Sequence, residues 1–163
     1  MSDPVRPYRP FGEGSRPSLH HTTAPGVPNA PAGGAWEPPN LTDVHVLPAG
    51  RWWDAVRAPQ YIGARALALL GEETGAVIED PRGRRLYWLV PPGTATAWSL
   101  QQVAVLAGAT YVAVPPRHVR HGGGPHWRVP VSHGRYLTDA PLLHAALRAA
   151  ITAELGPRPE AAP

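Results

Sequence analysis

The clearest pattern of apolar and polar positions lies in the middle of the chain. Residues 76–79, "AVIE", favour a strand, the next four residues have turn chemistry, and Arg85–Val90, "RLYWLV", is rich in β-formers. This order predicts a β-hairpin. A second stretch, "VAVLAGATYVAV", carries the small residues Ala107 and Gly108 between two apolar runs and predicts a second hairpin.

In both stretches an aromatic-apolar strand runs directly into a double proline. Val90 is followed by Pro91 and Pro92, and Val114 is followed by Pro115-Pro116. Because proline has no backbone N–H to donate, a strand that meets two of them leaves its sheet there. We therefore expect two neighbouring strands to end together at the rim of one site.

Helical spacing of apolar residues marks two further segments. Residues 59–70 begin at Pro59, where the missing N–H needs no partner, and stop before Gly71, a ready C-cap. The second segment follows the candidate N-caps Thr138 and Asp139 and stops at Gly156. Its apolar stripe at i+4 spacing is Leu143, Leu147 and Ile151.

Shorter strands are expected around Val44 and Val46, at Arg51–Val56, and in "HWRVPV" after a glycine-rich loop. Together the elements predict an α+β domain. We expect a mostly antiparallel sheet of about five or six strands, with two main helices packed on one face.

Composition divides the chain into three parts. Residues 1–40 contain nine prolines and almost no periodic apolar pattern, so they predict a disordered, proline-rich arm. Residues 42–156 are long enough for a single core and form the predicted α+β domain. Residues 157–163 are expected to be a flexible C-terminal tail.

Cysteine usage and charge narrow the functional classes. The chain has no cysteine, which excludes disulfides and thiolate metal sites. No apolar run approaches the roughly 20 residues of a membrane span, and the start lacks a signal segment, so we expect a cytoplasmic protein without a membrane partner. All 15 Lys+Arg residues are arginine, and the net charge of +3 permits an anionic partner without requiring one.

The order "DPRGRRLYWLVPPG", "VLAGATYVAVPPR", "HWRVP" resembles the bifunctional DNA primase/polymerase N-terminal family of the archaeo-eukaryotic primases, over about residues 50–130. The resemblance implies that the strands ending in prolines form the floor of a nucleotide site. It also implies nucleic-acid synthesis with two metal ions held by acidic residues.

The family's catalytic residues are poorly matched. Asp54 stands at the place of the first metal-binding acid, but Val56 occupies the place of the second, Arg85 that of a histidine, and Arg117 that of a serine. Because two-metal phosphoryl transfer needs at least two converging carboxylates, the resemblance implies a truncated relative without polymerase chemistry. We therefore expect no catalytic residue, bound metal or cofactor, and we regard Asp54 as a candidate metal-binding acid or a remnant of one.

The segment "PPRHVRHGGGPHWR" is the strongest binding candidate. Its glycines would let backbone N–H groups approach a phosphate, while arginines supply charge. The candidate phosphate-binding residues are Arg85, Arg117, Arg120, Arg128, His118 and His121. Two alternatives stay open, namely a solvated loop with incidental histidines and a zinc site that includes His126. Trp88 and Trp127 are expected to fill the core, with base stacking as the alternative.

The sequence thus predicts a non-catalytic, primase-like domain that binds nucleotide or nucleic-acid phosphate through an Arg/Gly-rich loop. One alternative is a regulatory module that binds a protein partner and no ligand. The other is a metal-dependent nucleotidyltransferase.

Overall fold

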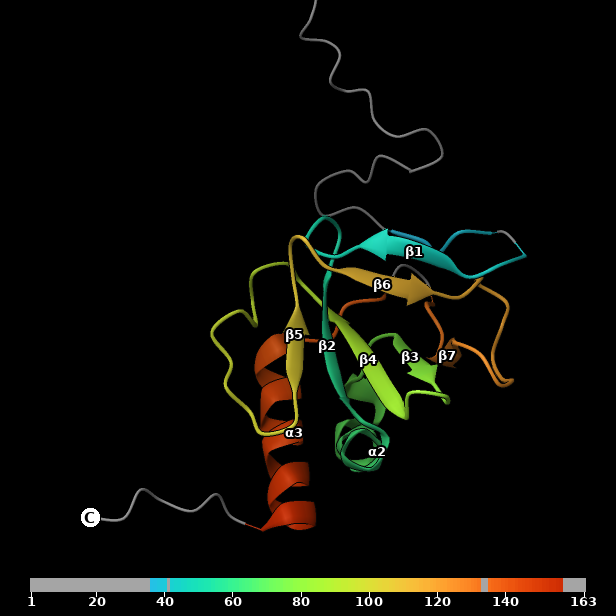
Figure 1. Ribbon diagram of the computed structural model, residues 1–163. Coiled ribbons are helices and arrows are strands. Elements are labelled where there is room, and N and C mark those ends of the chain that lie inside the picture. The colour runs from blue at the N-terminus through green and yellow to red at the C-terminus, as the bar shows by residue number, and fades with distance from the viewer. Residues whose placement is uncertain (1–35, 41, 133–134, 157–163) are drawn as a thin grey trace, which may run out of the picture. The chain divides into compact units, whose positions relative to one another are not determined.

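The computed structural model describes residues 36–40, 42–132 and 135–156. The predicted tail 157–163 and residues 1–35 of the predicted arm lie outside the described residues. The strands are β1 (His45–Pro48), β2 (Asp54–Pro59), β3 (Val77–Asp80), β4 (Arg85–Val90), β5 (Ala104–Leu106), β6 (Tyr111–Val114) and β7 (His126–Val129) (Figure 1). The helices are α2 (Gln60–Leu70), the short 3-10 helix η2 (Gly71–Glu73) and α3 (Ala140–Leu155).

The described strands form two antiparallel sheets. The larger has five strands in the order β5-β2-β4-β3-β7, and the smaller is a ribbon of β1 and β6. The α+β class with two main helices is therefore confirmed, and the sheet residues are divided between two sheets instead of one.

The hairpin of β3 and β4 is confirmed at its predicted position. Asp80 pairs with Arg85 at the turn, and the strands run antiparallel from there. A Cβ built on Gly83 would lie 2.7 Å from Oδ2 of Asp80, so a larger residue would have to displace that carboxylate. The residues of this turn are adjacent in the sequence, which is why the hairpin could be predicted from the local pattern.

The second predicted hairpin is wrong. The strand β5 pairs with β2, while β6 pairs with β1, so the chain crosses from one sheet to the other between them. Two contacts stabilise this crossing segment. Ala49 N donates to Thr110 O at 2.9 Å, and Gly50 packs closely against the backbone of Gly108. Because β4 and β6 belong to different sheets, the expectation that they end as neighbouring strands is also wrong.

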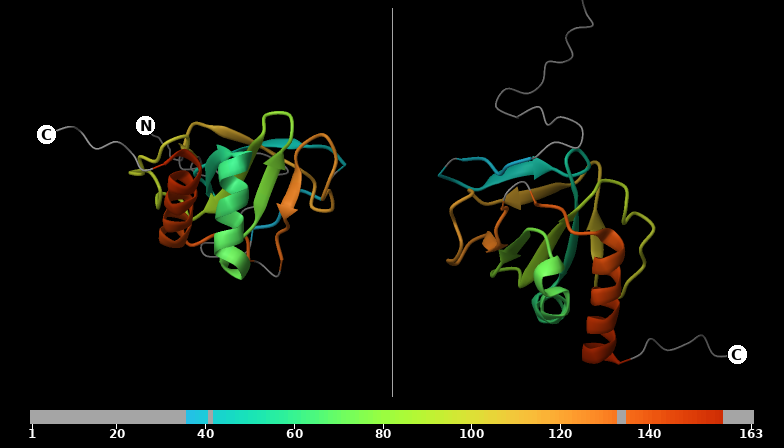
Figure 2. Two further views of the ribbon diagram at one scale, coloured as in Figure 1. Left: turned by 90° about the horizontal axis from the view of Figure 1, so that it is seen from below. Right: turned by 180° about the vertical axis from the view of Figure 1, so that it is seen from behind.

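The two helices form a layer against one face of the five-stranded sheet (Figure 2). Asp139 caps α3 as predicted, because its Oδ2 accepts from Leu142 N at 3.1 Å. The predicted stripe of α3 is buried, and it meets side chains of the sheet face below. This core contains Val56, Ile62, Ala66, Val77, Leu86, Trp88, Val90, Leu143, Leu147 and Ile151.

The β1–β6 ribbon lies on the side of the sheet away from the helices and crosses the upper part of the molecule in Figure 1. Near it Trp36, only 2% exposed, packs edge-on against Trp53, with ring centroids 5.7 Å apart. The Trp36 ring also lies 5.5 Å from that of Tyr136. Burial raises the pKa of Tyr136 above its usual 10.0, while a hydrogen bond with the Trp36 backbone acts in the opposite direction. The packed unit therefore already includes Trp36, although the sequence analysis places this residue in the N-terminal arm, residues 1–40.

Replacing Trp36 by alanine is expected to lower the free energy of unfolding by about 3 kcal/mol, because a buried indole leaves a cavity between two aromatic rings. The measurement is urea denaturation followed by circular dichroism. Tyr111→Ala is the control, since Tyr111 is 63% exposed and its loss should change stability by no more than about 0.5 kcal/mol. Equal stability of Trp36→Ala and the parent would mean that Trp36 does not belong to the core.

Candidate functional site

The Arg/Gly-rich loop, residues 117–125, is held in place by Trp127. The indole Nε1 donates to Pro115 O at 3.2 Å and to Pro116 O at 3.1 Å. The backbone N of Trp127 donates to Val119 O at 2.9 Å. Since Trp127 is 1% exposed, the expectation of a core residue is confirmed, and stacking on a base is wrong. The second double proline therefore supplies carbonyl acceptors that join the end of β6 to β7 (His126–Val129).

The loop itself lies on the surface. Arg117, His118, Arg120 and His121 are all exposed. Gly122 has a φ of +127°, a conformation that side chains rarely adopt. A Cβ built on Gly122, Gly123 or Gly124 would meet nothing within 4 Å, so the space where a side chain would stand is open at all three. A ligand can therefore approach the backbone along this stretch.

Arg117 is paired with the segment that precedes β1. Its Nη1 lies 2.7 Å from Oε1 of Glu37, and its backbone N donates to Pro39 O at 3.4 Å. The side chains of this ion pair are 49% and 58% exposed. Solvent screens the pair, so it contributes little to stability.

Arg128 is partly neutralised by Glu79, a residue that sequence reasoning missed. Arg128 Nη1 and His126 Nε2 lie 3.3 and 3.4 Å from the same carboxylate oxygen, Oε1 of Glu79, and Gln60 Nε2 donates to the other. His126 Nδ1 donates to Gly124 O at 2.9 Å, which ties the glycines to the sheet. Glu79 and His126 are register partners on β3 and β7, which only the pairing of these strands reveals.

The β3–β4 turn, residues 81–84, lies on the same side of the molecule as the loop, because Asp80 pairs with Arg85 beside the pair of Glu79 and His126. Figures 1 and 2 show the turn and the loop near each other. Arg85 donates from Nη1 to Gly83 O at 3.2 Å and to Arg84 O at 3.4 Å. We call this surface the basic flank: Arg82, Arg84, Arg85, Arg117, Arg120 and Arg128.

Positive charge exceeds negative charge on the basic flank. The six arginines share their segments and contacts with three carboxylates, Glu37, Glu79 and Asp80. Arg82, Arg84 and Arg120 are exposed, and none forms an ion pair with another described residue. The backbone segments that carry these arginines, residues 82–85 and 117–128, thus lie on one side of the fold.

Asp54 lies away from the basic flank, and its carboxylate holds a loop of the fold in place. It is 1% exposed, and its Oδ2 accepts from Gly93 N at 2.7 Å, which anchors the loop after the first double proline. Val56, on the same face of β2, is buried in the core beneath the helices. Within the described residues no group of three or more His, Asp or Glu side chains is placed to hold a metal ion.

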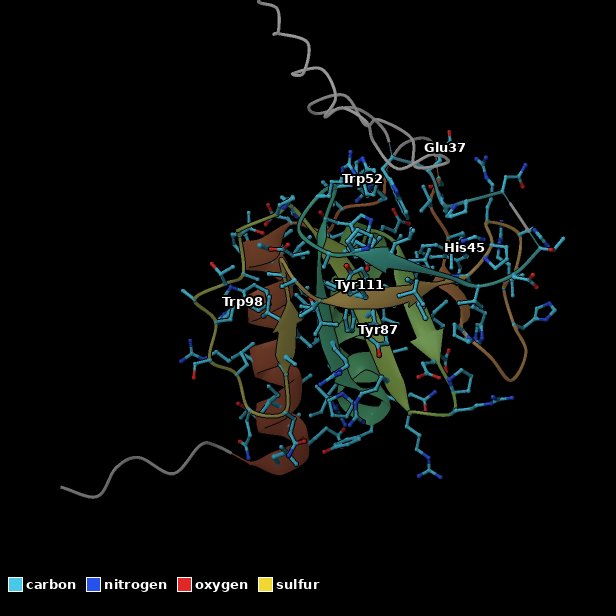
Figure 3. All side chains as sticks on the ribbon, turned by 45° about the horizontal axis from the view of Figure 1, so that its top comes forward. Glu37, His45, Trp52, Tyr87, Trp98 and Tyr111 are labelled. Atoms are coloured by element: carbon cyan, nitrogen blue, oxygen red, sulfur yellow. The ribbon has the colours of Figure 1, made fainter. Side chains whose placement is uncertain are left out.

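Arg57 and Tyr87 are further candidates for ligand binding, and the sequence analysis did not identify them. They are register partners on β2 and β4, on the face that the helices leave open, and both are half-buried. Arg57 forms no ion pair with another described residue. Figure 3 shows Tyr87 on β4 and the exposed Tyr111 on β6. Alternation along β2 places Arg57 away from the Val56 core, and the sequence analysis missed this because the strand it expected ended at Val56.

Comparison of the chain with family models, with curated proteins and with solved structures found no match. The resemblance to the primase/polymerase family therefore rests on the motifs quoted above. None of the helices among the described residues is long and apolar enough to cross a membrane.

Replacing Asp54 by alanine is expected to lower the free energy of unfolding by about 1–3 kcal/mol, because the hydrogen bond between the buried carboxylate and Gly93 N, which anchors the loop, would be lost. The shift in the urea midpoint measures this. Asp43→Ala removes the same charge at an exposed position and should leave the midpoint nearly unchanged. An Asp54→Ala variant as stable as the parent would show that the carboxylate serves another role.

Proposed function

We propose that this domain binds the phosphate groups of a nucleotide or a nucleic acid through the basic flank and catalyses no reaction on them. The observation that supports it is the loop 117–125, which Trp127 fixes from within the core while its charged residues stay exposed. A fixed loop presents its donors without a large ordering cost on binding.

Phosphate suits the chemistry of this surface. A guanidinium group donates two parallel hydrogen bonds to phosphate oxygens, and Arg82, Arg84 and Arg120 have no carboxylate partner among the described residues that would compete. The open backbone of Gly122–Gly124 offers approach to N–H groups as well. Exposed histidines at positions 118 and 121 add donors beside the arginines.

A binding function without chemistry agrees with the position of Asp54. One of its oxygens is engaged by Gly93 N, and the place of a second acid is taken by the buried Val56. The alternative of a metal-dependent nucleotidyltransferase therefore draws no support from the described residues.

The second candidate function, a regulatory module with a protein partner, is favoured by one observation. The outer face of the β1–β6 ribbon is apolar and exposed, with Val44 at 40%, Val46 at 65% and Tyr111 at 63%. Exposed apolar side chains that lie together are typical of protein contact surfaces. None of these three residues belongs to the basic flank, so the two candidates can be tested by substitutions at different residues.

The double variant Arg117→Ala/Arg120→Ala should bind a fluorescein-labelled oligothymidylate more weakly than the parent. Each phosphate contact on a single strand releases counterions when the complex forms. The loss of one contact should therefore flatten the slope of log K against log salt by about 0.7. Fluorescence anisotropy at several salt concentrations measures both quantities.

The matched control is Arg65→Ala/Arg148→Ala, which removes the same charge from the exposed side of the helix layer. It should retain the parent's slope. If both double variants lose affinity equally, the binding reflects net charge alone, and if the parent does not bind, the proposal is wrong.

A further inference from the structure

The contact between Glu37 and Arg117 places a carboxylate of the protein on an arginine of the basic flank. The segment around Glu37 is fixed, because Trp36 is 2% exposed, Pro38 is buried and Pro39 O accepts from Arg117 N at 3.4 Å. Glu37 itself is on the surface, at the upper edge of the molecule in Figure 3. The backbone therefore holds this carboxylate within reach of the guanidinium.

We propose that Glu37 is an internal competitor for the phosphate that Arg117 binds, so that the 36–40 segment lowers the affinity of the basic flank. This inference rests on the proposed function. A carboxylate and a phosphate use the same planar donors of arginine, and Glu37 already engages Nη1 of Arg117. The two anions also repel each other, so a phosphate that binds Arg117 favours a Glu37 side chain that has turned away.

The ion pair is suited to such displacement. Its side chains are 49% and 58% exposed, and exposed pairs are worth at most about 1 kcal/mol. The Glu37 side chain can leave while Trp36 stays buried against Trp53 and Tyr136, so the fold need not open. A phosphate ligand with several contacts on the flank can exceed this small cost.

The Glu79 side chain cannot be displaced as easily, although it pairs with Arg128 in the same region. Its side chain is 12% exposed and accepts from Gln60 and Arg128, and it lies 3.4 Å from His126 Nε2. Displacing it would leave several donors without their acceptor at the edge of the sheet. Glu79 therefore maintains the structure, whereas Glu37 is the displaceable acid.

The experiment uses the full chain and a fluorescein-labelled oligothymidylate, with affinity measured by fluorescence anisotropy at low salt. The test variant is Glu37→Gln. Its control is Glu154→Gln, because Glu154 forms an ion pair of the same 2.7 Å length with Arg65 on the helix layer. Both variants change the net charge by the same amount. A thermal melt of each variant establishes that it is folded.

Glu37→Gln should bind about two- to fivefold more tightly than the parent, and Glu154→Gln by a clearly smaller factor. In an Arg117→Ala background, Glu37→Gln should bring no gain, because the group it competes for is gone. Equal gains for Glu37→Gln and Glu154→Gln, or a gain that persists without Arg117, would overturn the inference.

The same experiment distinguishes a failure of the proposed phosphate binding from a failure of the competitor inference. If the parent and every variant fail to bind, both proposals are wrong. If the parent binds, Arg117→Ala weakens binding and Glu37→Gln has no effect, only the competitor is wrong.

Discussion

The hydrogen bonds of Trp127 are the constraint on which the candidate site depends. One buried indole N–H is shared between the carbonyls of Pro115 and Pro116, and the backbone N of the same residue donates to Val119 O. These contacts join the two prolines that follow the ribbon to an edge strand of the five-stranded sheet. The chain between them has to leave the sheets as a surface loop, and this loop carries the arginines. A core tryptophan thus determines where the charged residues lie.

Local features of the fold were predictable, and pairings between distant segments were not. The β3–β4 hairpin, the α2 helix and the capped α3 each depend on residues adjacent in sequence, such as Gly83 in its turn and Asp139 at its N-cap. The expected hairpin of β5 and β6 failed because their partners, β2 and β1, lie some fifty residues or more upstream. Two short apolar strands around a small-residue turn fit a hairpin and a crossing between sheets equally well.

The same distinction holds for the candidate site. The arginines and glycines of loop 117–125 are contiguous and could be identified from the sequence. Glu37 lies 80 residues from its partner Arg117, and Glu79 lies 49 residues from its partner Arg128. No local sequence pattern indicates ion pairs over such separations. The burial of Trp36 was also hidden, because the prolines around it favour an arm and its aromatic neighbours come from two distant segments. The sequence indicated the positive charges, and the fold revealed which of them are already paired.

A titration of the 15N-labelled protein with oligothymidylate, followed by two-dimensional NMR, locates the binding surface without any substitution. If the basic flank binds phosphate, the backbone amides that shift are those of residues 82–85 and 117–128, including the open glycines at 122–124. The amides of α2, α3 and the outer face of β1 and β6 should remain in place. Shifts confined to the helices or to the ribbon, or no shifts at any concentration, would contradict the assignment of this flank as the ligand surface.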